Sequence, residues 1–157
     1  MNYRALSRLA FILAVGNIIT SLSVAQDTVK NVPVSFVAVQ SNSIEWKYNP
    51  EMPGYRSAIM LGNPEESGPF IVRYKLPANL QVQPHTHPNA RTYTILKGEW
   101  KIGFGEYFEK EQLQRFSKGS LYWLPAGVPH YQMAGPEGAT IQIESIGPDA
   151  INFLDTQ

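Results

Sequence analysis

Short runs of β-branched and aromatic residues recur along this chain from Gln26 onward, and clusters of Gly, Pro and Asn separate them. Such residues favour extended strands because their side chains pack well on a pleated surface, whereas the residues between the runs favour turns. Many short strands at regular spacing predict a β-sandwich or a β-barrel. We therefore expect one all-β domain, with strands in the runs at 34–40, 55–61, 70–76, 92–98, 99–105, 120–125, 130–135 and 139–145.

One stretch has a helix-like composition. The segment YFEKEQLQRF at 107–116 contains Glu, Lys, Gln and Leu, which favour helix. It is short, however, and it lies between Gly105 and Gly119, so an isolated helix there would be marginal. We predict a loop or a single turn.

The first 25 residues differ in character from the rest. MNYRALSR is basic, LAFILAVG is apolar, and the small residues Ser23 and Ala25 precede a plausible cleavage point, an order that is typical of a secretory signal peptide. A membrane anchor is the alternative, but the apolar run is shorter than the ~20 residues that a spanning helix needs, and Asn17 interrupts it. The sequence therefore predicts a signal peptide at 1–25 and a mature domain at 26–157, exported to the periplasm or the cell exterior without stable membrane insertion.

Charge and cysteine content exclude several classes of partner and chemistry. The chain has 13 basic and 13 acidic residues, and removal of the predicted signal peptide leaves 11 basic and 13 acidic ones. A balanced charge without a basic stripe argues against binding to nucleic acid. The chain contains no cysteine, which excludes disulfides, thiol chemistry and lipid attachment to a cysteine.

The three histidines of the chain form a pattern. Side chains on a strand alternate between two faces, so His85 and His87 point the same way and Thr86 points the opposite way. His130 follows 43 residues after His87, directly behind LPAGVP, a segment that favours a tight turn at 124–127. A turn that places a third imidazole on a strand is expected where three histidines bind one transition metal.

These positions resemble the two motifs of the cupin superfamily. The first motif, G(X)5HXH(X)3,4E(X)6G, is similar to residues 79–98, and the second, G(X)5PXG(X)2H(X)3N, is similar to residues 119–134. The stretch TYTILKGEWKIGFGEYF also looks like part of a small single-domain cupin. The matching motif positions are His85, His87, Gly98, Gly119, Pro125, Gly127 and His130.

The resemblance implies a jelly-roll β-barrel with a metal site inside one mouth. In the family, three histidines and a glutamate hold a divalent transition metal, which is Fe, Mn, Ni, Zn or Cu. Carried over to this chain, the metal ligands would be His85, His87 and His130. The resemblance also implies a homodimer, because many small cupins form one.

The chain departs from the family motifs at three positions. Asn79 replaces the first glycine of the first motif, and Ala134 replaces the final asparagine of the second. Arg91 stands where the glutamate ligand belongs. A guanidinium offers no lone pair and stays charged at any working pH, so Arg91 cannot bind the metal.

Two interpretations of Arg91 remain open. In the first, the metal stays on the three histidines with more positions open, and Arg91 either swings aside or binds a carboxylate or phosphate of the ligand through its two-pronged guanidinium. In the second, the cation repels a divalent ion, so the pocket is empty or holds an organic anion directly. The presence of every histidine of the chain at a ligand position favours the first interpretation.

Four further residues are candidates for the site. Glu99 and Glu144 are the carboxylates that could replace the missing glutamate, although glutamate is usually solvated on strands. Tyr93 and Gln142 could line the cavity and, together with Arg91, contact a substrate.

Two classes of function fit this pattern. A metal with open positions can polarise an oxygen or activate water or O₂, which predicts an oxygenase, lyase or isomerase acting on a small molecule, an anionic one if Arg91 binds it. The alternative is a ligand carrier, sensor or metal-binding protein without turnover, because an apolar cavity with few polar groups is the usual ligand pocket. No second catalytic constellation stands out, and a purely structural module would leave the three histidines unexplained.

Overall fold

The structure, a computed structural model, describes residues 37–155. The predicted signal peptide at 1–25 and the first part of the predicted strand at 34–40 lie outside these residues. The described part forms nine strands and one 3₁₀ turn. They are β1 (Lys47–Tyr48), β2 (Arg56–Leu61), β3 (Gly68–Leu76), β4 (Gln81–Thr86), β5 (Arg91–Phe104), η1 (Lys110–Gln112), β6 (Gln114–Ser117), β7 (Leu121–Leu124), β8 (His130–Gly147) and β9 (Asn152–Phe153).

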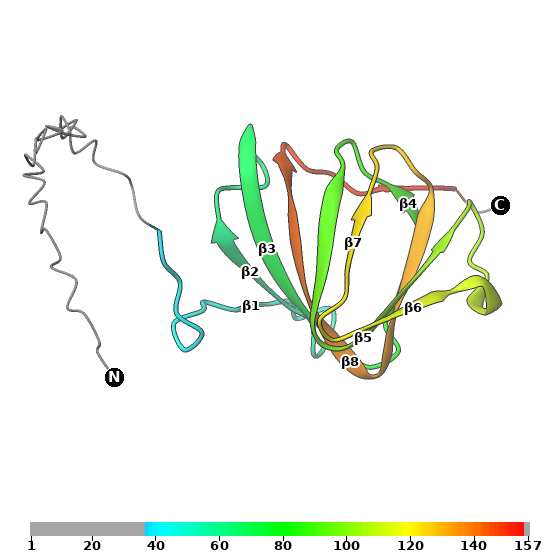
Figure 1. Ribbon diagram of the computed structural model, residues 1–157, viewed down its shortest axis with the longest axis horizontal. Helices are drawn as coiled ribbons and strands as arrows, with labels where there is room; N and C mark the ends of the chain where they lie inside the picture. The colour runs from blue at the N-terminus through cyan, green and yellow to red at the C-terminus, as the bar shows by residue number, and fades with distance from the viewer. Residues whose placement is uncertain (1–36, 156–157) are drawn as a thin grey trace, which may run out of the picture. The chain divides into compact units, whose positions relative to one another are not determined.

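Two long strands, β5 and β8, hold the fold together (Figure 1). They pair antiparallel with each other almost along their whole length, and each pairs with different neighbours at its two ends. One half of β8 pairs with β3 and the other half with β4, while β5 pairs with β7 and then with β6. Strands β1, β2 and β9 extend the sheet at its edges, in the order β1-β2-β3-β8-β4-β9. The sheet therefore curls into a barrel in which β5 and β8 belong to both layers.

The bend in β5 depends on a glycine. Gly98 has a φ of +70°, and a Cβ at this position would lie 2.1 Å from the carbonyl oxygen of Gly138 on β8. Only glycine fits such a close backbone approach in the left-handed region. The register between β5 and β8 shifts on either side of Gly98, so the strand bends there without breaking.

The all-β prediction is confirmed, with differences in where strands begin and end. The predicted runs at 92–98 and 99–105 form the single strand β5, and those at 130–135 and 139–145 form β8. The glycines between these runs bend the strands instead of ending them. Residues 37–40 form no strand.

Four strands lie outside the predicted runs, namely β4, β6 and the two-residue strands β1 and β9. The strand β4 is rich in Gln and contains Pro84, both of which weaken a strand pattern. Within the predicted loop or turn at 107–116, η1 is the single turn, and β6 begins at Gln114 and pairs with β5.

The core fills the space between the two layers. Buried side chains alternate with more exposed ones over residues 91–95 of β5 and 139–143 of β8, as expected for strands with one buried face. Polar groups inside the core are hydrogen-bonded to one another: the Tyr122 hydroxyl accepts hydrogen bonds from Trp100 Nε1 at 3.2 Å and from Gln132 Nε2 at 3.0 Å. The buried core residues are Leu76, Tyr93, Ile95, Trp100, Ile102, Leu124, Ala134, Ala139, Ile141 and Ile143.

Within residues 37–155, no helix is long and apolar enough to span a bilayer.

Candidate metal centre

The three histidines meet where β4 ends and β8 begins. His85 and His130 are directly paired across β4 and β8, and their ring centroids are 4.2 Å apart. His87 lies just beyond β4, with its ring centroid 4.8 Å from that of His85 and 5.3 Å from that of His130. The Gly127 N–H, in the turn before His130, donates to the His87 carbonyl oxygen at 2.9 Å. One candidate ligand atom from each ring lies within 4.8 Å of the others.

Main-chain carbonyls orient all three rings. A carbonyl oxygen can only accept a hydrogen bond, so each Nδ1 carries the proton and each Nε2 keeps its lone pair. The Nε2 atoms of His87 and His130 are buried and have no hydrogen-bond partner within the described part of the chain. The Nδ1 atoms contact the carbonyl oxygens of Gln83 (His85, 2.7 Å), Ala150 (His87, 2.7 Å) and Val128 (His130, 2.9 Å).

Electrostatics favour the neutral form of each ring. Burial lowers the pKa of His87 to about 3 and that of His130 to about 4, and it also lowers the pKa of His85. The Arg91 cation adds to the lowering at His87. A divalent transition metal binds neutral imidazoles through a free ring nitrogen, and a hydrogen bond from the other ring nitrogen to a carbonyl oxygen is the usual outer-shell support. The donor set therefore fits such an ion.

An irregularity in strand β4 precedes His85. Its register with β8 shifts between Val82 and His85, and Pro84 lies in this irregular stretch. Proline lacks an N–H and is tolerated in a strand only at an edge, at the first residue or at a bulge. Because the ladder is already interrupted here, Pro84 does not leave a hydrogen bond of the sheet unmade.

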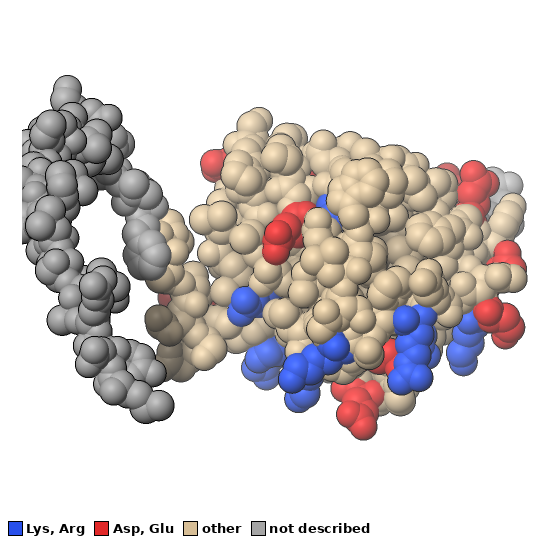
Figure 2. Space-filling view, viewed as in Figure 1, with Lys and Arg blue, Asp and Glu red and all other residues tan. Residues whose placement is uncertain are grey.

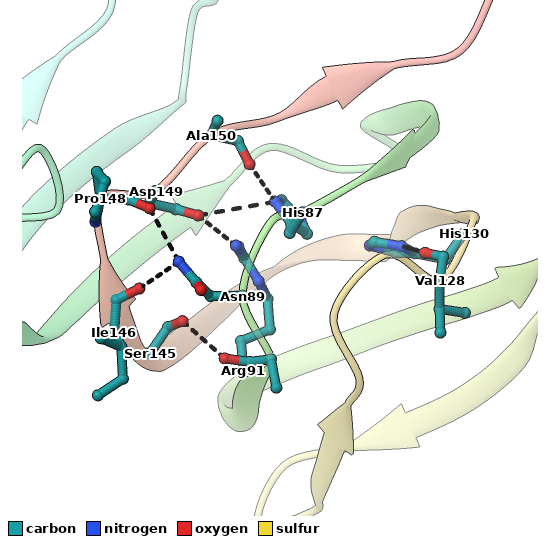
Figure 3. A network of polar contacts seen from close by, with 11 residues as sticks. His87, Asn89, Arg91, Val128, His130, Ser145, Ile146, Pro148, Asp149 and Ala150 are labelled. Atoms are coloured by element: carbon teal, nitrogen blue, oxygen red, sulfur yellow. Dashed lines mark hydrogen bonds and ion pairs between the residues drawn. The ribbon is translucent and has the colours of Figure 1, made fainter.

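Arg91 is buried, at 3% exposure, and it forms an ion pair through Nη2 with Asp149 Oδ1 (Figure 3). The same Asp149 oxygen lies 4.0 Å from Nδ1 of His87, on the side of the ring away from its Nε2. Arg91 therefore lies beside the histidines, and the Asp149 carboxylate compensates its positive charge. The repulsion that the sequence alone predicts between Arg91 and a divalent cation is reduced accordingly.

Hydrogen bonds from neighbouring loops hold Asp149 in place (Figure 3). The Asn89 amide donates to the carbonyl oxygens of Ile146 at 2.9 Å and Pro148 at 3.0 Å, and the Asp149 N–H donates to Pro64 O at 2.7 Å. Sequence reasoning missed Asp149, which lies 58 residues from Arg91 and belongs to no motif. Its position one residue before the carbonyl that holds His87 emerges only from the fold.

A cavity of about 370 Å³ adjoins the histidines. His85, His87 and Arg91 line one part of it, and its other walls are mainly apolar and aromatic. No Asp or Glu is among its lining residues within residues 37–155. The remaining lining residues are Asn49, Met52, Tyr55, Tyr74, Leu76, Leu80, Gln81, Val82, Gln83, Tyr93, Trp100, Gln132, Ile141, Ile143, Ile151 and Phe153.

The predicted lining residues divide between the two faces of the sheet. Tyr93 lines the cavity, fully buried, and burial raises the pKa of its hydroxyl, which therefore stays protonated. Gln142 does not line it: its side chain accepts from Arg73 Nε at 2.7 Å and donates to Glu144 Oε1 at 2.8 Å. Its neighbours Ile141 and Ile143 face inward, so alternation along β8 places Gln142 on the outer face.

The two alternative carboxylates also lie away from the histidines. Glu144 is exposed on the outer face of β8, bonded to Gln142. Glu99 pairs with Lys101, at 3.1 Å, and with Arg115. Among the described residues, the group that could hold a metal consists of the three histidines alone, and neither candidate carboxylate, Glu99 or Glu144, is part of it.

Comparison with solved structures finds the same fold in several proteins. The polyketide cyclase RemF from Streptomyces resistomycificus superposes with a TM-score of 0.62 at 13% identity, over 78% of this chain and 87% of that one. The oxalate decarboxylase of Lactobacillus farciminis, in a formate complex, gives a TM-score of 0.57 at 18% identity, over 77% of this chain and 37% of that one. KdgF from Halomonas sp. gives a TM-score of 0.55 at 17% identity, over 73% of this chain and 96% of that one. These likenesses show the fold.

Sequence comparison gives the family. One curated relative, "Aspartic protease-like protein pynH" of Aspergillus niger, is 29% identical over 139 residues, which are 85% of this chain and 32% of that protein. The chain therefore spans about a third of this relative's length. The family model described as "Cupin" matches residues 61–156, which include all three histidines and most of the barrel. The chain belongs to the cupin family.

Proposed function

We propose that this protein is a metal-dependent enzyme that acts on a small molecule, with a divalent transition metal held by His85, His87 and His130. One observation carries the proposal: main-chain carbonyls hold Nδ1 of all three rings, one candidate ligand atom from each ring lies within 4.8 Å of the others, and the Nε2 atoms of His87 and His130 are buried without a partner in the described structure. A metal on three histidines keeps positions open for a substrate or water and supplies Lewis-acid chemistry there.

The cavity residues would bind and orient the substrate. Tyr93, protonated because it is buried, is placed to donate a hydrogen bond to a substrate oxygen. Gln132 is held by its hydrogen bond to Tyr122, so its amide is ordered before the substrate arrives. The aromatic and aliphatic walls exclude water, which strengthens polar contacts inside the cavity.

A non-catalytic binding protein is the second candidate. The observation that favours it is the composition of the cavity wall, which lacks a carboxylate within the described residues, so that general acid–base work would fall to tyrosines or to bound water. Structural neighbours such as the oxalate decarboxylase and the polyketide cyclase favour an enzyme, since both are named for reactions.

Metal analysis followed by turnover assays separates the two candidates. The purified protein would be stripped with a chelator, reloaded singly with Fe(II), Mn(II), Ni(II), Zn(II) or Cu(II), and assayed for O₂ uptake and substrate loss on a panel of small organic acids and ketones. Stoichiometric metal with turnover supports the enzyme, and stoichiometric metal without turnover on any panel member supports the binding protein. Failure to bind any of the five ions at micromolar concentration would overturn both.

We also propose export to the periplasm or cell exterior, on the basis of the N-terminal sequence, and a homodimer. The support for a dimer is an apolar outer face around β7, where Trp123 is 62% exposed and Leu121 60% exposed. Figure 2 shows that this side carries few charged groups, which gather instead along the lower edge. Sedimentation velocity of the wild type and of Trp123→Lys tests the dimer, which should dissociate in the variant.

A further inference from the structure

We infer that the ligand of this cavity is a carboxylate with an apolar body, and that Arg91 binds its carboxylate group. The inference rests on the proposed function, because it assigns the substrate class of the same site. The inference goes beyond the proposed function because it names the residue that selects the ligand.

The first support is the state of the Arg91 side chain. A guanidinium carries five N–H donors, and in the described part of the chain its ion pair with Asp149 engages Nη2 only. Nε of Arg91 is buried and has no partner. A buried charged donor without a partner costs free energy unless a ligand satisfies it. Since Arg91 lines the cavity, a ligand there can reach the guanidinium.

The second support is the pairing with Asp149. This carboxylate binds Nη2 and so restrains the guanidinium, while Nε has no partner in the described structure (Figure 3). Loop hydrogen bonds in turn hold Asp149, through its own N–H to Pro64 O and through Asn89 to the carbonyl of Pro148. Arg91 is therefore organised before a ligand binds, which lowers the entropic cost of recognition.

The third support is the chemistry of the other walls. The polar groups that line the cavity are the Arg91 guanidinium, tyrosine hydroxyls and side-chain amides, together with the two histidines of the metal group. With no carboxylate in the wall of the described structure, a cationic ligand would be unpaired there, whereas an oxygen-rich anion finds donors.

The fourth support is the shape of the remaining space. Beyond Arg91 and the histidines, the wall is formed by side chains such as Tyr55, Tyr74, Leu80 and Ile141, and the Tyr55 and Tyr74 rings lie 5.8 Å apart. A cavity of about 370 Å³ is near the lower end of the range for small-molecule pockets, so the ligand is compact. An apolar body of one ring or a short branched chain fits these walls.

Calorimetric titration with matched probes tests this inference. The probes are phenylacetate, its neutral counterpart phenylacetamide, and acetate, which lacks the apolar body. Each is titrated into chelator-stripped and Zn(II)-loaded protein. We expect phenylacetate to bind about tenfold or more tightly than phenylacetamide, which is the size of effect that one charge-assisted hydrogen bond gives. It should also bind more tightly than acetate, because acetate buries no apolar ring.

The decisive variant is Arg91→Gln combined with Asp149→Asn, because it removes the cation without leaving a buried carboxylate unpaired. The expected result is a loss of the preference for phenylacetate over phenylacetamide, to within about twofold, with an unchanged circular-dichroism spectrum. Arg73→Gln is the matched control, since Arg73 pairs with Gln142 on the outer face, and it should keep the full preference. Should the double variant not fold, Arg91→Lys, which keeps the charge but loses the fork, should weaken phenylacetate binding by about tenfold.

The outcomes separate the inference from the proposed function. If stripped protein prefers phenylacetate and no metal binds, the inference stands and the proposed function fails. If Zn(II)-loaded protein binds phenylacetate equally well with and without Arg91, the metal alone recognises the anion and the inference is overturned. The inference is overturned as well if phenylacetate binds no better than phenylacetamide or acetate in both forms of the wild type.

Discussion

The Gly127 N–H donates to the carbonyl oxygen of His87 at 2.9 Å, which ties the turn before β8 to the end of β4. This bond joins the two halves of the histidine group, because His130 begins β8 three residues after Gly127. Main-chain hydrogen bonds thus assemble the site, and we expect the metal-free protein to be folded.

Replacement of single histidines should remove metal binding without unfolding the barrel. Each of His85→Ala, His87→Ala and His130→Ala loses a direct ligand, so Zn(II) affinity should fall by more than the roughly 10–100-fold that loss of an outer-shell partner causes. Competitive titration with a chromophoric chelator measures this affinity. Gln142→Ala, on the outer face, is the control and should match the wild type. Wild-type affinity in all three histidine variants would place the metal elsewhere.

The stability of the metal-free protein should fall as the pH decreases from about 6.5 toward 3. In this window the unfolded chain, with ordinary histidine pKa values near 6.5, takes up protons, but folded His87 and His130, with pKa values of about 3 and 4, do not. The unfolded state binds more protons, so the free energy of unfolding decreases with decreasing pH. The expected decrease is on the order of a few kcal/mol.

Urea denaturation at a series of pH values measures this slope. The variant His130→Gln should show a shallower slope between pH 6.5 and 4, because one of the shifted groups is gone. Equal slopes in the variant and the wild type would mean that His130 titrates normally in the folded state.

The paired substitution Arg91→Glu with Asp149→Asn should tighten metal binding. It replaces a neutral ion pair with a single carboxylate at the position where family members carry a ligand, so the local charge becomes one unit more negative. Zn(II) affinity should rise at least about tenfold, which is the effect of 1.4 kcal/mol.

The single change Arg91→Glu is the informative comparison. It places two carboxylates side by side, which should raise the pKa of one of them and make metal binding depend more steeply on pH than in the paired variant. Zinc titrations of the two variants at pH 6 and pH 8 would show this difference. If neither variant differs from the wild type at either pH, the Arg91 side chain does not face the metal.

Asn79 should tolerate glycine but not a branched side chain. It is the one non-glycine residue with a positive φ within residues 37–155, at +58°, and it stands where the family motif has glycine. Asparagine tolerates this left-handed conformation, whereas a β-branched residue is strained in it. We expect Asn79→Val to lower the free energy of unfolding by about 1–2 kcal/mol and Asn79→Gly to change it little, as measured by urea denaturation. A stability for Asn79→Val equal to that of the wild type would contradict the left-handed backbone.

Export should leave a new N-terminus. Expression in the native host, followed by N-terminal sequencing of the extracytoplasmic fraction, should give Gln26 or its cyclised form if cleavage follows Ala25. Recovery of intact Met1 from the soluble cytoplasm would exclude the signal peptide.

The sequence by itself determined the fold class and the candidate metal ligands. Strand-forming runs with turn residues between them predicted a β-sandwich or a β-barrel, and the resemblance to the cupin motifs pointed to His85, His87 and His130, which the fold does bring together. These features are local, because alternation on a strand and the geometry of a tight turn depend on neighbouring residues only. The chemistry of Arg91 was also readable from the sequence, since a guanidinium cannot bind a metal in any fold.

The tertiary structure decided what surrounds Arg91. Asp149, which neutralises it, and the Ala150 carbonyl, which orients His87, come from a segment 58 to 63 residues away in sequence. Their placement depends on β8 running the full depth of the barrel and on loop hydrogen bonds from Asn89, none of which has a local signal. An ion pair between residues so far apart forms only after the sheet has closed, so the sequence determined which group stands at the motif position and the fold determined its charge environment.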